Sequence, residues 1–267
     1  GGTMLPEQLD FAVRSEEVYN QHQTKIPGYK QLVRDDTNEL IAIHKDSYKV
    51  ITHQQSYELA YDYLSNHFHT DDMTEQYRVS NKGALMAIHF RLPAYSVPYK
   101  GSFITLEAIL HNSYNGMRQL TFDLGYYFML CLNGLKSPLW DVRISSQHKG
   151  NKEVTFERPN TFDVNDRLRT VSNTMEKWSS IPVDNNELEY QVDQLCLQPT
   201  EQDKSHVNQR HRGYILDEYY DNYSRQFGKN KFSAYQAMTH WSTHYPSDSI
   251  NTRYDRERKV ANCKWFH

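Results

Sequence analysis

The fold is decided by one stretch, residues 85–132, which reads LMAIHFRLPAYSVPYKGSFITLEAILHNSYNGMRQLTFDLGYYFMLCL. Its first part alternates side chains between two faces, and we predict a strand over Tyr77–Val97. Further strands are predicted over Ser102–His111 and Gln119–Leu132, and Asn115-Gly116 between them is a strong signal for a tight turn. The centre of the chain is therefore predicted to be an antiparallel sheet.

The flanking segments extend this pattern in both directions. Toward the N-terminus, we predict a short helix and an extended arm over residues 5–30. A hairpin is expected at Tyr29–Val33 and Leu40–His44, followed by a helix with Thr52 as its N-cap. Downstream, Arg143–Glu157 is a further predicted hairpin. Four later segments carry apolar residues three and four positions apart and are predicted helices: Val164–Trp178, Glu187–Leu197, Gly213–Phe227 and Ser233–His244.

Strands in the first part and helices in the second predict an α+β fold. We expect an antiparallel β-sheet in the N-terminal and central part, packed by helices, and a helical C-terminal portion. Gly1-Gly2-Thr3 ahead of Met4 carry no structural signal. A single domain is therefore predicted over residues 4–267, strand-rich over 29–157 and helix-rich over 163–267.

Composition narrows the class of protein. A chain of 267 residues can bury a core without disulfides or a metal, so no cofactor is expected on grounds of stability. No apolar run approaches the roughly 20 residues of a membrane-spanning helix, and no basic stretch precedes an apolar one at the N-terminus. The three cysteines are widely spaced, which favours a reducing compartment. We predict a cytoplasmic protein.

Charge is distributed unevenly along the chain. Residues 81–152 hold eight Lys and Arg against three acids, and residues 224–267 hold the same balance. The other two segments are acidic, with 7 basic residues against 13 acids in 1–80 and 7 against 14 in 153–223. A concentrated basic patch is typical of a polyanion-binding site. If the basic segments are instead neutralised by the acidic ones, they form only solvated faces.

Basic and aromatic residues are interleaved in the predicted central strands, where the cations would follow phosphates and the rings would stack on bases. The candidate nucleic-acid-binding residues are Arg91, Tyr95, Tyr99, Lys100, Phe103, Arg118, Arg143, Lys149 and Lys152. The alternative is that the rings face the core and the lysines keep an edge soluble.

Three other groups of residues are candidates for chemistry. His240 and His244 are four apart on a predicted helix and could hold a metal, as could His67 and His69 with Asp71-Asp72. Cys131 is a candidate nucleophile, although a thiol at the end of an apolar strand is commonly inert. Buried or solvated structural roles are the alternatives. The sequence contains no phosphate-binding loop, dinucleotide-binding fingerprint or serine-hydrolase elbow, and we predict that the protein is not an enzyme.

Four stretches resemble the phage/plasmid-like protein family known as domain of unknown function 932. They are Leu32-Val33-Arg34-Asp35-Asp36 with Leu40 to Ile51, Leu110 to Gly116, Cys131-Leu132-Asn133-Gly134, and Ala234 to Thr239. The chain departs from the family where an Asp is common, because Tyr114-Asn115 stands there. Any chemistry that depends on that Asp is in doubt here. The resemblance implies a phage-encoded protein in the cytoplasm of an infected bacterium, and the sheet with helices behind it is similar in layout to phage single-strand annealing proteins.

These observations predict a non-enzymatic protein that binds single-stranded DNA in phage replication or recombination, with annealing as an added activity. Phage or host replication and recombination proteins are further expected partners, and a homo-oligomer is left open. A second hypothesis is a module that binds or inhibits a host protein through the acidic segment 184–221. A metal-dependent nuclease is a third, and it would need a carboxylate-rich pocket.

Overall fold

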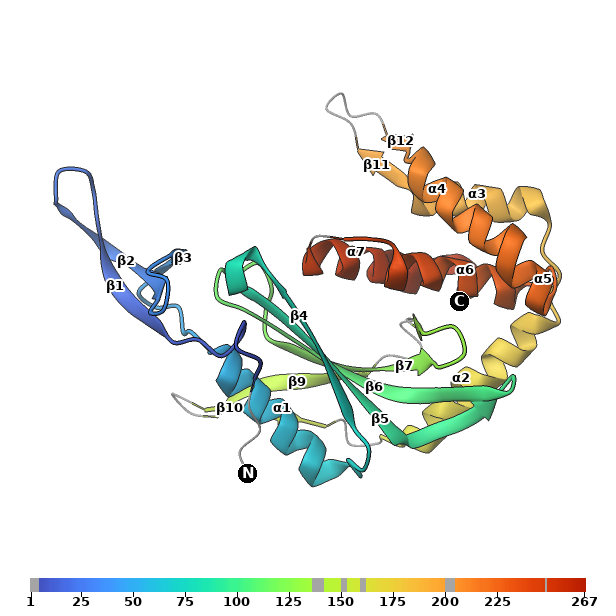
Figure 1. Ribbon diagram of the computed structural model, residues 1–267, viewed down its shortest axis with the longest axis horizontal. Helices are drawn as coiled ribbons and strands as arrows, with labels where there is room; N and C mark the ends of the chain where they lie inside the picture. Colours follow the sequence, from blue (N-terminus) through green and yellow to red (C-terminus); the bar gives the residue numbers. More distant parts are fainter. Residues whose placement is uncertain (1–4, 136–141, 150–152, 159–161, 200–204, 248) are drawn as a thin grey trace.

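The structure, a computed structural model, describes residues 5–135, 142–149, 153–158, 162–199, 205–247 and 249–267. Its centre is a seven-stranded antiparallel sheet (Figure 1). The strands are β4 (Thr74–Ser80), β5 (Leu85–Tyr99), β6 (Ser102–Ser113), β7 (Thr121–Phe128), β8 (Asn133–Leu135), β9 (Val142–Lys149) and β10 (Glu153–Glu157). Six of them follow the order β10-β9-β7-β6-β5-β4, and β8 pairs with β7. The antiparallel sheet predicted for the centre of the chain is confirmed.

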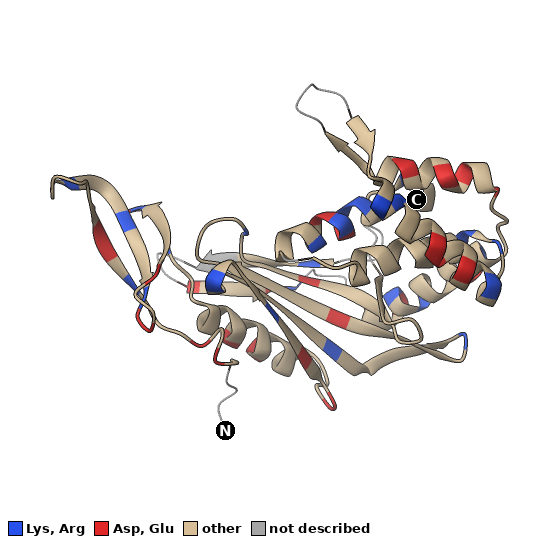
Figure 2. Ribbon diagram, turned by 45° about the horizontal axis from the view of Figure 1, so that its top comes forward, with Lys and Arg blue, Asp and Glu red and all other residues tan. Residues whose placement is uncertain are grey.

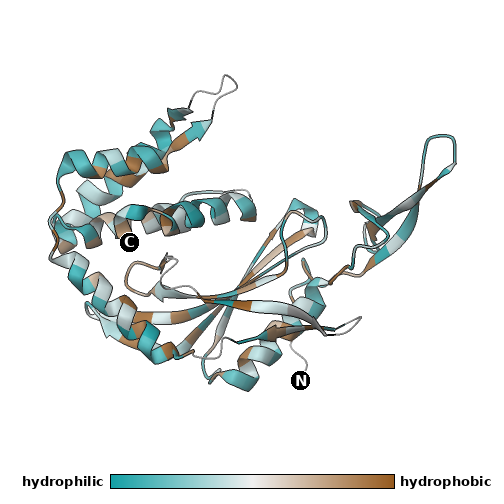
Figure 3. Ribbon diagram, turned by 180° about the vertical axis from the view of Figure 1, so that it is seen from behind, coloured by the Kyte–Doolittle hydropathy of each residue, from teal (hydrophilic) through white to brown (hydrophobic). Residues whose placement is uncertain are grey.

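Helices cover both faces of this sheet. On one side lie α1 (His53–His67) and α2 (Val164–Ser179), and α7 (Ile250–Ala261) runs over the other (Figures 1 and 3). Helix α6 (Lys231–His244) packs against β8, α2 and α7. The connection from α2 to α6 is made by α3 (Asn185–Leu195), the hairpin of β11 (Leu197–Pro199) and β12 (Ser205–Val207), α4 (Gln209–Asp217), a π-helical turn (Glu218–Tyr223) and α5 (Ser224–Phe227). The α+β class and the helical C-terminal portion are thus confirmed.

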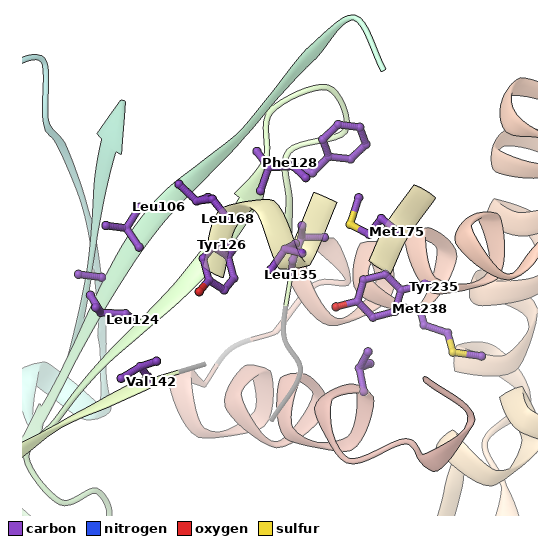
Figure 4. Close-up of a cluster of buried hydrophobic side chains, with 14 of the residues drawn as sticks. Leu106, Leu124, Tyr126, Phe128, Leu135, Val142, Leu168, Met175, Tyr235 and Met238 are labelled. Carbon is purple, nitrogen blue, oxygen red and sulfur yellow. The ribbon is translucent and has the colours of Figure 1, made fainter. Parts of the chain in front are cut away.

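Strand alternation gives the sheet one apolar and one polar face. Ile88 and Phe90 of β5 are fully buried on the first face, where the Phe90 ring lies 6.1 Å from that of Tyr57 in α1. Apolar side chains of β6 to β9, α2 and α6 complete the main core (Figure 4). Each such buried side chain contributes about 1.5 to 3 kcal/mol. His89 and Arg91 alternate with these residues and therefore lie on the opposite face, over which α7 passes.

Residues 5–30 differ from the prediction. Instead of the expected short helix, Val13–Tyr19 forms strand β1, which pairs with β2 (Lys25–Arg34). Pairing with a neighbouring strand satisfies the backbone groups of this segment, whereas an isolated helix of that length is marginal in water. The predicted hairpin is confirmed as β2 with β3 (Leu40–Lys45). The three strands form a small separate sheet that projects from the body (Figure 1).

The predicted helices are present with small changes at their ends. Thr52 caps α1 as expected: its hydroxyl accepts a hydrogen bond from the Gln55 amide at 3.0 Å, and the Gln55 side chain accepts one from the Thr52 amide at 2.9 Å. The segment predicted as one helix over Gly213–Phe227 is interrupted by the π-helical turn. Within the part of the chain that the structure describes, no helix is both long and apolar enough to cross a membrane.

Gly83, in the turn between β4 and β5, lies against Phe11 of the N-terminal segment, and no side chain fits there. Its φ is +92°, and a Cβ there would lie 2.7 Å from Cε1 of Phe11. Gly83→Ala is therefore expected to lower the free energy of unfolding by about 2 kcal/mol or more, through left-handed backbone strain and the steric clash together. Gly28→Ala is the matched control, because its φ is +85° but nothing lies within 4 Å of the added Cβ. Equal losses in urea unfolding would contradict the clash.

Candidate nucleic-acid interface

Two basic segments that are far apart in sequence meet where α7 crosses the sheet. The Arg118 guanidinium lies 3.5 Å from the ring centroid of Tyr254 and donates a hydrogen bond to Oδ1 of Asn251 at 2.9 Å. Arg143 of β9 and Arg258 of α7 line a pocket of about 170 Å³ beside the same ring. We call Arg118, Arg143, Tyr254 and Arg258 the Tyr254 surface. In the ribbon of Figure 2, Lys and Arg positions recur along α7.

Two acids line the pocket beside Tyr254, and each accepts a hydrogen bond from one arginine. Asp123 lies opposite Arg143 in the β7–β9 register, and Nε of Arg143 donates to Asp123 Oδ1 at 3.0 Å. This carboxylate raises the pKa of Arg143, so the guanidinium stays charged. Glu257, which also lines the pocket, accepts a hydrogen bond from Nε of Arg253 at 3.0 Å. With Arg118 and Arg258 counted, the four arginines exceed the two acids, and the surface keeps a positive charge.

Beneath α7 the sheet presents a buried polar layer. Nδ1 of His89 lies 2.8 Å from Oε1 of Glu107, and both side chains are buried. Arg91 stands opposite Glu107 in the β5–β6 register, and its guanidinium lies 3.8 Å from the ring centroid of Tyr127. Charged groups out of water need such partners. Arg91, one of the predicted phosphate contacts, therefore packs against Tyr127 and does not belong to the Tyr254 surface.

A bulge in β5 separates Tyr95 and Tyr99 from Arg91. The β5–β6 register shifts between Leu92 and Ser96, so residues after the bulge exchange faces. Tyr99 is only 7% exposed, and its ring packs against Phe128 and Phe232 in the main core. Its ring is therefore occupied by core packing rather than presented to solvent.

Tyr95 of β5 lies beside the C-terminal end of α1. Its ring meets that of Phe68 edge to face at 5.4 Å, and its hydroxyl accepts a hydrogen bond from the His69 amide at 2.9 Å. The structure therefore does not bring Tyr95 together with Arg118 and Arg143.

The remaining predicted residues are dispersed. Nζ of Lys100, at the β5–β6 turn, lies 4.9 Å from the ring centroid of Phe232. Phe103 is 51% exposed near the same turn. Lys149 pairs through its backbone with Glu153 in the predicted hairpin, which is confirmed as β9–β10, but its side chain and the whole of Lys152 lie outside the described residues. Of the predicted side chains that the structure describes, only Arg118 and Arg143 come together at α7.

The helix that completes this surface was not predicted from the sequence. Between Ile250 and Ala261 the segment is mostly polar, and its periodic apolar signal is carried by few residues. The one usable sign was Ser249, whose hydroxyl accepts a hydrogen bond from the Asn251 amide at 3.2 Å and caps the helix. The excess of positive charge in 224–267 is visible in the sequence, but Tyr254 and Arg258 were not predicted as site residues.

Tyr223 of the π-helical turn contacts two of the other candidate sites for chemistry, the His240–His244 pair and the segment that contains Cys131. Its hydroxyl is hydrogen-bonded to Nδ1 of His240 at 2.8 Å and accepts a hydrogen bond from Nδ2 of Asn133 at 3.2 Å. The imidazoles of His240 and His244 are 4.5 Å apart between centroids, and burial lowers the pKa of both. Burial also raises the pKa of the Cys131 thiol to about 11. A protonated, half-buried thiol is a weak nucleophile, so this cluster is suited to packing.

Metal ligation finds no support at either histidine pair. Within the described ranges, no group of three or more His, Cys, Asp or Glu side chains is arranged to hold a metal ion. Oε1 of Glu218 lies 3.7 Å from Nε2 of His240, but a third ligand does not complete that pair.

The stretches that carry the family resemblance tie the elements of the fold together. Asn112 donates hydrogen bonds from Nδ2 to the Ile51 carbonyl at 3.0 Å and to Nδ1 of His53 at 3.1 Å. The Tyr114 hydroxyl accepts a hydrogen bond from the His53 amide at 2.8 Å. These contacts join the central strand β6 to the start of α1.

The later matching stretches act in the same way at the other side of the sheet. The Gly134 amide donates to Oγ1 of Thr243 at 3.0 Å, and Nδ2 of Asn133 donates to Oε1 of Gln236 at 3.0 Å. Both contacts fasten β8 to α6. In this chain, these motif residues thus serve the architecture. His111, in the stretch Leu110 to Gly116, also lines the pocket beside Tyr254, with the two rings 5.4 Å apart.

Comparison with known proteins gives one match. No curated protein and no solved structure matches this chain. A family model described as Domain of unknown function (DUF932) matches residues 41–264, which include the central sheet, α6 and α7. That span is most of the chain, and it contains all the stretches by which β6 and β8 are tied to the helices. The protein therefore belongs to the DUF932 family.

Proposed function

We propose that this protein binds single-stranded DNA through the Tyr254 surface and catalyses no reaction. The observation that carries the proposal is the meeting of the two basic segments, residues 81–152 and 224–267, around one aromatic ring. Neutralisation of phosphates by clustered arginines releases counterions and supplies affinity that does not depend on sequence. In keeping with the phage relatives that the family resemblance implies, the role is protection or annealing of single strands during phage replication or recombination in the cytoplasm of the host.

The shape of the surface favours a single strand over a duplex. Its cations come from two elements that line one pocket, Arg143 from the sheet and Arg258 from α7. A flexible strand can bend its phosphates toward both elements, whereas a rigid duplex reaches only the outer rim. Exposed Phe103 offers a further ring for stacking at the far end of β6.

The test is fluorescence anisotropy with a labelled single-stranded oligonucleotide and a duplex of equal length, each over a salt series. We expect tighter binding of the single strand and a steep loss of affinity as salt rises. Absence of binding at low salt, or binding that does not change with salt, would overturn the proposal.

Removal of the acid that pairs with Arg143 should strengthen binding. Asp123→Asn keeps the shape of the side chain, frees the Arg143 guanidinium for a phosphate and removes one repelling charge. Ion pairs near a protein surface are worth about 0.2 to 1 kcal/mol, so an increase in affinity of up to about fivefold is expected. The same anisotropy titration measures it. Asp166→Asn, which removes a charge from the exposed Asp166–Arg169 pair of α2, is the control and should leave the affinity unchanged.

A second candidate function is capture of a host protein by the acidic helix α3. Glu187, Glu189 and Asp193 lie on this helix, and the Tyr190 ring beside them is 60% exposed, so it is accessible to a partner. This function predicts no retention on single-stranded DNA and recovery of one specific partner in a pulldown that Tyr190→Ala abolishes.

A further inference from the structure

A second cavity continues the Tyr254 surface around α7. It has a volume of about 620 Å³ and lies between α3 and the C-terminal end of α7. Arg258 lines both this cavity and the pocket beside Tyr254, so the two are adjacent. We call the larger one the α3–α7 groove.

The groove combines cations with side-chain amides. Three of its lining residues are basic and three carry amides, and they are Arg258, Lys259, Lys264, Gln191, Gln194 and Asn262. Asp255 is the acid that lines it. Glu187 of α3 stands nearby, but its Oε1 accepts a hydrogen bond from Nε1 of Trp265 at 2.9 Å. The lining therefore has an excess of positive charge.

This combination matches the chemistry of an unpaired nucleotide. Lysine and arginine bind phosphate oxygens, while a carboxamide both donates to and accepts from the edge of a base. The volume lies within the range of sites that enclose small organic ligands. The Watson–Crick edges of the bases are already paired in a duplex, so only a single strand can present those edges to the amides.

We infer that the α3–α7 groove binds the nucleotides that follow those on the Tyr254 surface in the same DNA single strand. Phosphates lie at Lys259 and Lys264, and unpaired bases meet the amides of Gln191 and Gln194. The inference rests on the proposed function and extends it, because it makes the groove the source of preference for unpaired bases. The strand passes from the sheet to α3 across Arg258.

The first test uses Cys263, which lines the groove with its Sγ 3.9 Å from Oε1 of Gln191. In a Cys131→Ala/Cys196→Ala background it is the one remaining cysteine of the sequence. Burial raises the pKa of this thiol, so maleimide labelling is best followed at alkaline pH. We expect a saturating single-stranded oligonucleotide of about 12 nucleotides to slow labelling at least fivefold, and one of about 4 nucleotides to protect it far less. Equal labelling with and without the longer oligonucleotide would overturn the inference.

The second test keeps all the cysteines and serves if that background does not fold. Lys259→Ala/Lys264→Ala should weaken binding of the longer oligonucleotide about tenfold and leave the short one unchanged. Gln191→Ala/Gln194→Ala should weaken it about threefold, but should not affect an abasic oligonucleotide of the same length.

The outcomes separate the two proposals. Failure of the wild-type protein to bind any single strand removes the proposed function and the groove together. Binding that depends on Arg118 and Arg143 but not on the groove variants overturns the groove alone. If polyglutamate protects Cys263 as well as the oligonucleotide does, the groove takes polyanions in general, and its role in reading bases is overturned.

Discussion

Replacing Arg118 and Arg143 together by Ala is expected to weaken binding of a single-stranded oligonucleotide about 30-fold at low salt. Each lost contact with a phosphate costs about 1 kcal/mol at a partly exposed position, and the two sites are separate, with Arg118 in the β6–β7 turn and Arg143 on β9. The salt dependence should fall too, because each phosphate contact contributes about 0.7 to the slope of log K against log salt for a single strand. A salt series by anisotropy therefore measures a loss of about 1.4 in slope along with the affinity.

Two controls separate charge from structure in this experiment. Asn251→Ala removes the hydrogen-bond acceptor of Arg118 but keeps its charge, so binding should change little. Arg169→Ala/Lys177→Ala removes two exposed positive charges from α2, on the other side of the sheet, and should not change the slope. An equal loss in this distant pair would show that net charge alone drives binding and would contradict a localised site.

The sheet could be predicted because its signals are local. Alternation within residues 85–132 and the turn residues between the strands depend only on neighbours in sequence, and they led to β5, β6 and β7. The N-terminal arm could not be predicted in the same way. Whether Val13–Tyr19 forms a helix or a strand is decided by its partner β2, which lies beyond the segment itself.

The candidate site was predicted only in part, for two physical reasons. A bulge between Leu92 and Ser96 exchanges the faces of β5, and strict alternation from Arg91 therefore misplaces Tyr99. The second reason is that the surface is built from two segments more than a hundred residues apart. The charge excess of each could be counted in the sequence, but the contact between Arg118 and Tyr254 depends on the path of the helices in between.

A second large effect is expected from acid, through His53. This histidine is fully buried at the start of α1, with Nε2 donating to the Gly83 carbonyl at 2.7 Å and Nδ1 accepting from Nδ2 of Asn112 at 3.1 Å. Both ring nitrogens are thus engaged by the neutral imidazole, and a proton on Nδ1 would oppose the Asn112 amide. Burial lowers the pKa of His53 to about 4, from 6.5 in the unfolded chain.

Because the unfolded chain binds this proton near pH 6.5 and the folded protein does so only near pH 4, stability should fall as pH is lowered between these values. The loss of folding free energy attributable to His53 is about 3 kcal/mol between these pH values, and none of it is expected above pH 7.

Urea unfolding of the wild type and of His53→Gln at pH 7, 5.5 and 4.5 measures this loss, since the other titrating groups remain in both proteins. His53→Gln should be less stable at pH 7 but should lose less on acidification, whereas His22→Gln, in the exposed β1–β2 turn, should follow the wild type. Parallel losses in the wild type and His53→Gln would mean that folding does not lower the pKa of His53, although the Asn112 amide at Nδ1 opposes the charged form.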